Sequence, residues 1–81
     1  MHKGRLRWQC RRGMKELDAL LVRYLDNVYD ESAPEQKSAF ESLLTLSDPE
    51  LIAYLLKGER AESDITNAII DRILGRASPG S

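Results

Sequence analysis

The residues of this chain that are best suited to binding chemistry lie in its N-terminal fifth. The first fifteen positions hold six basic residues and no acid: Lys3, Arg5, Arg7, Arg11, Arg12 and Lys15. Glu16 is the first acid, four positions after Arg12, with Gly13 between them. Arginine presents planar donors that suit carboxylates or phosphates. A glycine in or beside a helix costs about 0.5–1 kcal/mol relative to alanine, so it needs a reason. We therefore predict that segment 11–16 is a charged docking surface.

Charge is distributed unevenly along the 81 residues. Residues 1–15 carry +6, and residues 16–81, with six basic and thirteen acidic residues, carry −7, which together give the net charge of −1. This asymmetry indicates a charged partner for the N-terminal end. Two structural alternatives stay open. One is a solvated basic helix, and the other is a helix junction at Gly13 with a local ion pair between Arg12 and Glu16.

Catalytic, metal-binding and membrane-spanning classes find little support in the sequence. One cysteine, Cys10, and one histidine, His2, offer no internal disulfide, no metal-ligand cluster and no nucleophile–base pair, so Cys10 is expected to be a small packing residue. P-loop and dinucleotide-binding glycine patterns are absent. No apolar run approaches the roughly 20 residues that span a membrane, and the N-terminus lacks the apolar region of a secretory signal. We expect a cytoplasmic binding or accessory protein rather than an enzyme, without a metal, a stably bound cofactor or a membrane contact.

Apolar residues at steps of three and four predict helices throughout the chain. The expected helices cover about 4–11 and 14–29, then a third ending near 46, a fourth ending at Gly58, and a fifth from Ser63 or Asp64 to Gly75. Two capping boxes, Ser32 to Glu35 and Ser47 to Glu50, each with a proline in the first turn, mark the starts of the third and fourth helices. Asp48 and Glu50 are interpreted as capping residues, because acids are favoured in the first turn of a helix.

This periodicity also predicts which side chains face inward. They are Leu6 and Cys10; Met14, Leu17, Leu20, Leu21, Tyr24, Leu25 and Val28; Phe40, Leu43 and Leu44; Leu51, Ile52, Leu55 and Leu56; and Ile65, Ile69, Ile73 and Leu74. Trp8 stays open, either as a core residue or as an anchor for a partner. The expected fold is all-α, a small bundle of four to five short helices in a single domain over 1–75. Residues 76–81 are expected to form a flexible C-terminal tail.

The N-terminal segment resembles the SdhE family of flavinylation factors, small helical proteins that assist succinate dehydrogenase assembly. It matches the family's R-x-x-W-x-C-R-R-G-M-x-E-L-D block, with its R-G-x-x-E signature, through Arg5-Leu6-Arg7-Trp8-x-Cys10-Arg11-Arg12-Gly13-Met14-Lys15-Glu16-Leu17-Asp18. Further matches follow at similar spacing: Tyr29-Asp30, Phe40-x-x-Leu43-Leu44, Asp48-Pro49-x-Leu51 and Tyr54-Leu55-x-x-Gly58. One departure is Tyr54, where relatives commonly carry tryptophan. The resemblance covers roughly residues 5–74, and the block of fourteen positions is specific.

The resemblance implies an assembly factor that is not itself an enzyme. Members of the family bind the flavoprotein subunit of succinate dehydrogenase, and often that of fumarate reductase. They promote covalent attachment of FAD to a histidine of that subunit, so FAD is expected as the group attached to the client and not as a cofactor of this chain. By position, the implied docking contacts are Arg12, Gly13 and Glu16, with Trp8, Arg11 and Asp18 in second rank.

Two other functions are compatible with a basic N-terminal helix. Nucleic-acid binding is one, although the charge of −7 on the remainder of the chain and the lack of a helix with base-reading polar residues argue against it. The other is an antitoxin-like regulator of a cytoskeletal or toxin partner, a role that has been attached to relatives of the family.

Overall fold

The computed structural model describes residues 2–75, whose backbone forms five α-helices and one short 3₁₀ helix. In chain order these are α1 (His2–Cys10), α2 (Lys15–Asn27), η1 (Tyr29–Glu31), α3 (Pro34–Leu43), α4 (Asp48–Leu55) and α5 (Asp64–Leu74). No strand occurs within the described residues, so the predicted all-α fold is confirmed. The predicted flexible tail, 76–81, lies outside the described residues.

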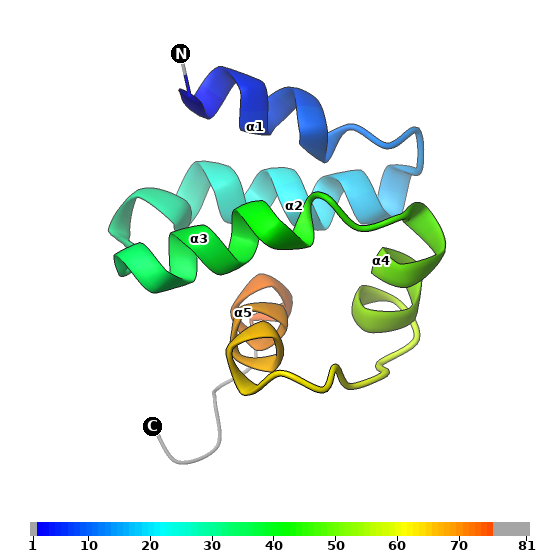
Figure 1. Cartoon of the computed structure of the whole chain (residues 1–81). Coiled ribbons are helices and arrows are strands. Elements are labelled where there is room, and N and C mark those ends of the chain that lie inside the picture. The colour runs from blue at the N-terminus through cyan, green and yellow to red at the C-terminus, as the bar shows by residue number, and fades with distance from the viewer. Residues whose placement is uncertain (1, 76–81) are drawn as a thin grey trace.

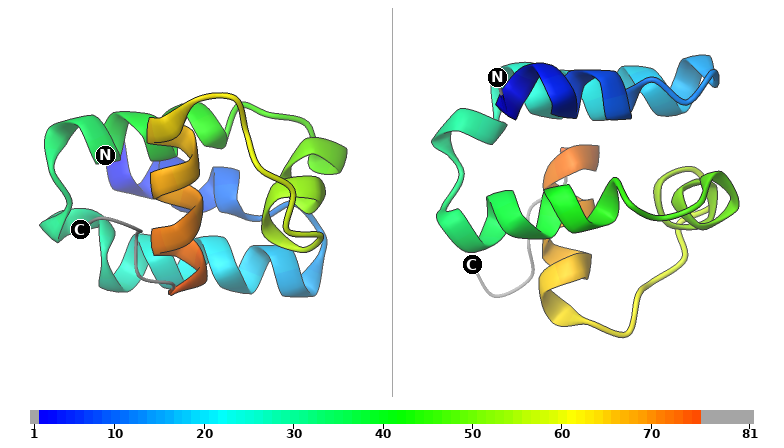
Figure 2. Two further views of the ribbon diagram at one scale, coloured as in Figure 1. Left: turned by 90° about the horizontal axis from the view of Figure 1, so that it is seen from below. Right: turned by 45° about the horizontal axis from the view of Figure 1, so that its top comes forward.

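The second helix, α2, is the element around which the others are arranged (Figure 1). α1 lies along α2, and α5 packs against both α2 and α3. In Figure 2, α5 runs across these two helices, whereas α4 lies beside the N-terminal half of α2. None of the helices within residues 2–75 combines the length and apolar character that crossing a membrane requires.

The core is built from one apolar stripe on each helix, as the periodicity predicts. Its buried residues are Leu6, Cys10, Leu17, Leu21, Tyr24, Leu25, Tyr29, Phe40, Leu43, Leu44, Leu51, Leu55, Ile69, Ile70 and Ile73. The ring of Phe40 lies 4.7 Å from that of Tyr24 and 5.7 Å from that of Tyr29, centroid to centroid, in tilted arrangements that aromatic pairs favour. This aromatic cluster joins α2 and η1 to α3.

The first predicted capping box, Ser32 to Glu35, is wrong by one residue. α3 begins after Ala33, whose backbone N–H donates to the side-chain oxygen of Gln36 at 3.1 Å. Ser32 is buried, and its hydroxyl instead bonds with the Tyr24 hydroxyl at 2.7 Å and with the Val28 carbonyl at 2.9 Å. A tertiary contact has therefore taken the side chain that the local pattern assigned to a cap.

The later helix boundaries follow the sequence more closely. Ser47 and Glu50 form the predicted capping box of α4, and Ser63 accepts a hydrogen bond from the Thr66 amide at the start of α5. Gly75 ends α5 in a left-handed conformation with φ 76°, as a C-terminal glycine often does. The end of three helices comes earlier than predicted by two or more residues, at Asn27 for α2, Leu43 for α3 and Leu55 for α4. The first helix, expected over about 4–11, covers His2–Cys10.

Two residues predicted to be buried are exposed at the surface. Leu56 is 38% exposed and Ile65 is 43% exposed. Leu56 is the residue after the last turn of α4, and Ile65 lies in the first turn of α5. Each lies at a helix end, beyond the area that neighbouring helices cover, and the helical period alone does not mark where that cover stops.

Candidate functional site

The turn between α1 and α2 reverses the chain at the segment predicted to dock a partner (Figure 1). Gly13 has φ 85°, in the left-handed region that side chains disfavour, so the predicted break at this glycine is confirmed. A Cβ atom built on Gly13 would meet nothing within 4 Å. The conformation of the backbone, rather than crowding by this chain, is therefore the reason for a glycine here.

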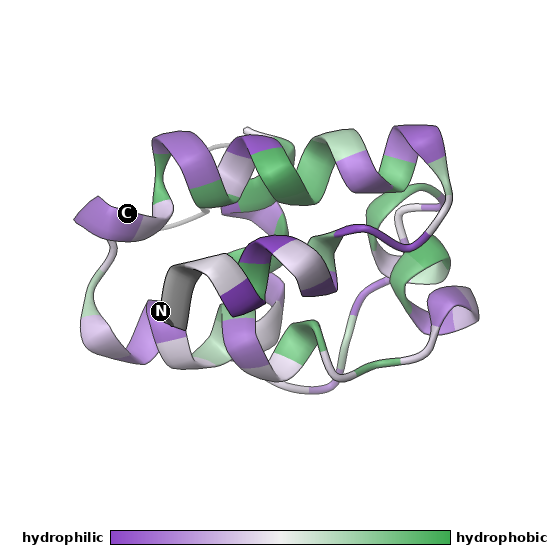
Figure 3. Cartoon of the chain, turned by 90° about the horizontal axis from the view of Figure 1, so that it is seen from above, coloured by the Kyte–Doolittle hydropathy of each residue, from purple (hydrophilic) through white to green (hydrophobic). Residues whose placement is uncertain are grey.

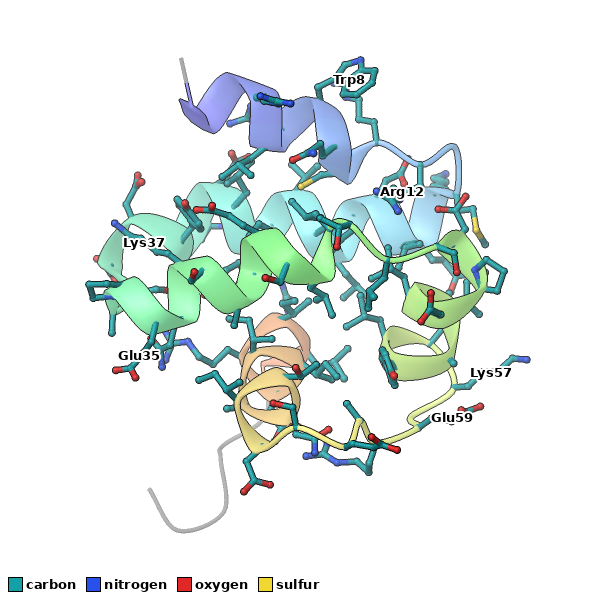
Figure 4. The ribbon with its side chains drawn as sticks, in the orientation of Figure 1. Trp8, Arg12, Glu35, Lys37, Lys57 and Glu59 are labelled. Atoms are coloured by element: carbon teal, nitrogen blue, oxygen red, sulfur yellow. The ribbon has the colours of Figure 1, made fainter. Side chains whose placement is uncertain are left out.

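Arg12 points inward and ties the turn to the connection between α3 and α4 (Figure 4). Its Nε donates to Asp48 Oδ1 at 2.9 Å, and its Nη1 donates to the carbonyls of Gln9 and Leu44, both at 3.0 Å. Nη2 donates to the Leu46 carbonyl. Only 16% of the side chain is exposed. Arg12 thus donates hydrogen bonds to the carbonyls of Leu44 and Leu46, which have no helical partners because α3 ends at Leu43.

The alternative of a local Arg12–Glu16 ion pair is wrong. Arg12 precedes α2, so the two residues do not share a helix, and the guanidinium pairs with Asp48 instead. Asp48 is likewise more than a helix-capping residue. It lies in the first turn of α4, where Ser47 provides the cap, and it anchors the arginine.

Asp18 also works within the turn. Its Oδ1 accepts a hydrogen bond from the Arg12 amide at 2.8 Å, and its Oδ2 accepts one from the Gly13 amide at 3.2 Å. A carboxylate in the first turn of α2 also suits the positive end of the helix dipole. Asp18 therefore holds the backbone of the turn, and its two oxygens are already engaged.

The inward side of α1 is apolar and closely packed. Leu6 and Cys10 are buried, and at the exposed edge of this contact Arg7 forms an ion pair with Asp26 of α2. Burial raises the pKa of the Cys10 thiol to about 11, more than the positive charges of Arg7 and Arg12 lower it. The thiol is thus protonated and enclosed, which agrees with a packing role and not with a nucleophile.

The opposite side of the same segment is exposed. Trp8 is 76% exposed and points away from the body of the molecule (Figure 4), which decides against a core role. Arg11, Gly13 and Glu16 are also exposed. Most residues of α1 and of the turn that follows it are hydrophilic, as the colours of the ribbon show in the view from above (Figure 3). We call Trp8, Arg11, Gly13 and Glu16 the outer residues of the turn.

A shallow groove between α2 and α4 begins beside one of these outer residues. It has a volume of about 380 Å³ and is lined by Glu16, Ala19, Leu20, Arg23 and Leu56. Sequence reasoning missed it because Leu20 and Leu56 were assigned to the core. The periodicity contains no signal for the groove, which exists only where the end of α4 meets α2.

The chemistry offered by this region is recognition. Arginine and tryptophan are among the residues that most often dominate protein interfaces. The turn exposes one of each, Arg11 and Trp8, together with the carboxylate of Glu16. Within the described residues, no group of three or more histidine, cysteine or acidic side chains is placed to hold a metal ion.

Comparison with known proteins agrees with the resemblance. A family model described as the flavinator of succinate dehydrogenase matches residues 4–77. The chain belongs to this family. Among curated members, the FAD assembly factor SdhE of Colwellia psychrerythraea is 45% identical over 76 residues, which cover 94% of this chain and 84% of the relative.

Two further relatives carry the same name. The FAD assembly factor SdhE of Idiomarina loihiensis is 43% identical over 74 residues, covering 91% of this chain and 82% of the relative. That of Shewanella oneidensis is 40% identical over 79 residues, covering 98% and 96%. No solved structure matches the chain significantly. The flavinator family match spans α2, α4 and the turn before α2, so it includes the outer residues and the groove.

Proposed function

We propose that this protein binds the flavoprotein subunit of succinate dehydrogenase and promotes the covalent attachment of FAD to that subunit. Membership of the flavinator family and the names of the relatives support this role. The observation that carries the proposal is the two-sided turn. Hydrogen bonds of Arg12 and Asp18 within the chain hold it in shape, while Trp8, Arg11 and Glu16 remain exposed.

The proposed mechanism requires no reacting group from this chain. The new bond joins the client's own histidine to the client's own flavin, and both must be held in register for the bond to form. A helper favours that arrangement by binding one conformation of the client more tightly than the others, which shifts the population toward it. A rigid surface suits this task, because a partner that is already ordered loses less conformational entropy on binding.

Within this proposal the six predicted site residues divide into two groups. Arg12 and Asp18 position the turn, since their polar atoms are engaged within the chain. Trp8, Arg11 and Glu16 contact the client, and Gly13 leaves open space in which the client backbone approaches closely. The division revises the ranking implied by the resemblance, in which Arg12 was itself a docking contact.

The same surface is proposed to serve the flavoprotein subunit of fumarate reductase in cells that contain that enzyme, as the resemblance implies. The cytoplasm is the proposed site of action, because a chain with one unpaired cysteine suits a reducing compartment.

The test is complementation in cells that lack their own assembly factor, with covalent flavin on the client read by in-gel fluorescence. Glu16→Ala and Gly13→Arg are expected to abolish the gain in flavinylation while retaining helical circular dichroism. Glu35→Ala is the matched control, because Glu35 is also an exposed acid in the first turn of a helix but lies at the opposite end of the molecule (Figure 4). Normal flavinylation with both test variants would refute the proposed docking surface.

A further inference from the structure

The groove between α2 and α4 is continuous with the outer residues of the turn, because Glu16 belongs to both. Ala19 and Leu20 on α2 and Leu56 at the end of α4 form its apolar lining. Leu56 is 38% exposed, so part of the apolar lining is open to solvent. The groove is therefore an apolar hollow at the edge of a polar surface, which is the arrangement of an interface pocket and its rim.

The two ends of the groove carry opposite charges. Glu16 and Arg23 are seven residues apart on α2, which places them two turns, or about 10 Å, apart along one face. Arg23 is held in place at its end, because its Nη2 donates to the Ile73 carbonyl at 2.9 Å. No ion pair joins Glu16 to another of the described side chains, so its carboxylate is available to a partner.

We propose that this groove receives one apolar side chain of the flavoprotein subunit, flanked by a basic group that meets Glu16 and by a carboxylate or carbonyl oxygen that meets Arg23. The inference rests on the proposed function, since it assigns a second contact to the same client. Two features select this occupant. The apolar lining fits a side chain and not a charged ligand, and the opposite charges at the ends fit a peptide segment with complementary groups.

The groove also explains how a small turn achieves specificity. Exposed charge pairs contribute little affinity on their own, whereas burial of one side chain the size of leucine or phenylalanine contributes roughly 1.5–3 kcal/mol. Loss of this contact is expected to weaken client binding by about ten- to a hundredfold. A polar client surface without the apolar side chain would lack this contribution to the binding free energy.

Two variants test the groove from opposite directions, with affinity for the purified flavoprotein subunit measured by isothermal titration calorimetry. Ala19→Leu fills the hollow at an exposed position of α2, and Leu56→Gln keeps the size of the side chain but makes the lining polar. Both are expected to raise Kd about tenfold or more. Ser38→Leu is the matched control, because it adds the same side chain at an exposed position of α3 that lines neither the groove nor the turn. It is expected to leave Kd within twofold of the parent protein.

The outcomes separate this inference from the proposed function. If the parent protein binds the subunit and all three variants bind equally well, the groove assignment is overturned and the proposed function stands. If the parent protein does not bind the subunit, both are overturned. Sedimentation supplies the remaining check: a homodimer that Leu56→Gln dissociates would show that the groove holds a second copy of this chain, which also overturns the assignment. Circular dichroism confirms that each variant is folded before its affinity is compared.

Discussion

The inward and outward sides of the segment from Leu6 to Asp18 differ in almost every physical respect. Leu6 and Cys10 are buried, and the polar side-chain atoms of Arg12 and Asp18 form hydrogen bonds within the chain. Trp8, on the other side, is 76% exposed. Contacts on the inward side determine the shape of the turn. That shape fixes the positions of the outer residues on the exposed side.

Arg11 and Arg12 show most clearly what this difference teaches. They are adjacent and chemically identical, yet Arg11 is exposed, whereas Arg12 bonds to Asp48 and to carbonyls of Gln9, Leu44 and Leu46. Residue type alone therefore does not assign a role in a docking motif. The acceptors that the fold places within reach of each side chain assign it.

The largest expected effect on stability comes from Arg12→Ala. Carbonyls of Leu44 and Leu46 and the carboxylate of Asp48 would lose a charged donor, and hydrogen bonds to charged groups contribute about 1.5–3 kcal/mol. We expect the free energy of unfolding to fall by about 2–3 kcal/mol in urea titrations followed by circular dichroism. Arg11→Ala should change it by less than about 0.5 kcal/mol. Equal losses in the two variants would break the comparison between inward and outward arginines.

The next effect is a loss of stability at alkaline pH. The pKa of Cys10 is raised from 9.0 to about 11 by burial. Between these values the unfolded chain releases the proton and the folded chain retains it, so stability falls as the pH rises through this range. The full loss is on the order of 2 kcal/mol.

Cys10→Ala isolates that contribution. Its free energy of unfolding should stay level from pH 9 to 10, where the parent protein already loses stability. Above pH 10 both proteins should lose stability, because burial and a hydrogen bond to Glu41 raise the pKa of Tyr29 from 10.0 to about 12. The parent protein should continue to lose more than Cys10→Ala up to about pH 11. Identical pH profiles below pH 10 would show that Cys10 is not enclosed.

A smaller effect is expected from Gly13→Ala. The side chain has room, but a non-glycine residue in the left-handed region costs roughly 1–2 kcal/mol. Gly13→Asn should cost less, since asparagine adopts this conformation more readily. Gly4→Ala is the control, because Gly4 lies within α1 with open space around it, and alanine there should stabilise the protein by about 0.5 kcal/mol. The unfolding free energies of all three variants are read from the same urea titrations.

The smallest change in stability is expected for Trp8→Ala. Because Trp8 is 76% exposed, little packing is lost, so the free energy of unfolding should change by less than about 0.5 kcal/mol. Affinity for the flavoprotein subunit should nevertheless fall more than tenfold in calorimetry, because exposed tryptophans often dominate interfaces. A large loss of stability would place Trp8 on the inward side and remove the contrast with Cys10.

Local sequence patterns predicted the helices well where only residues close together in the chain determine the structure. Ser47 and Glu50 form their capping box in the structure, and the chain breaks at Gly13 and ends α5 at Gly75 as predicted. Most of the apolar stripes also reach the core. These features depend on residues that are close together in the chain, so their energies can be judged without knowing the fold.

Predictions were wrong where tertiary packing, rather than the local pattern, determined the surroundings of a side chain. Ser32 has the sequence of a cap, but Tyr24 lies against it and takes its hydroxyl. Leu56 has the spacing of a core residue, but its helix ends before α2 can cover it, and the uncovered surface becomes part of the groove. No local pattern contains the position of the partner in either case.

By itself, the sequence determined that this protein is a small helical domain with a charged segment broken by a glycine, and that the segment resembles the flavinator family. Those properties follow from residue types, helical periodicity and spacing. Only the tertiary structure decided that Arg12 and Asp18 face inward while Trp8, Arg11 and Glu16 remain exposed. The physical reason is that the direction of a side chain in a turn depends on which acceptors the rest of the fold brings within reach. For Arg12, three of the four acceptors lie more than thirty residues away along the chain.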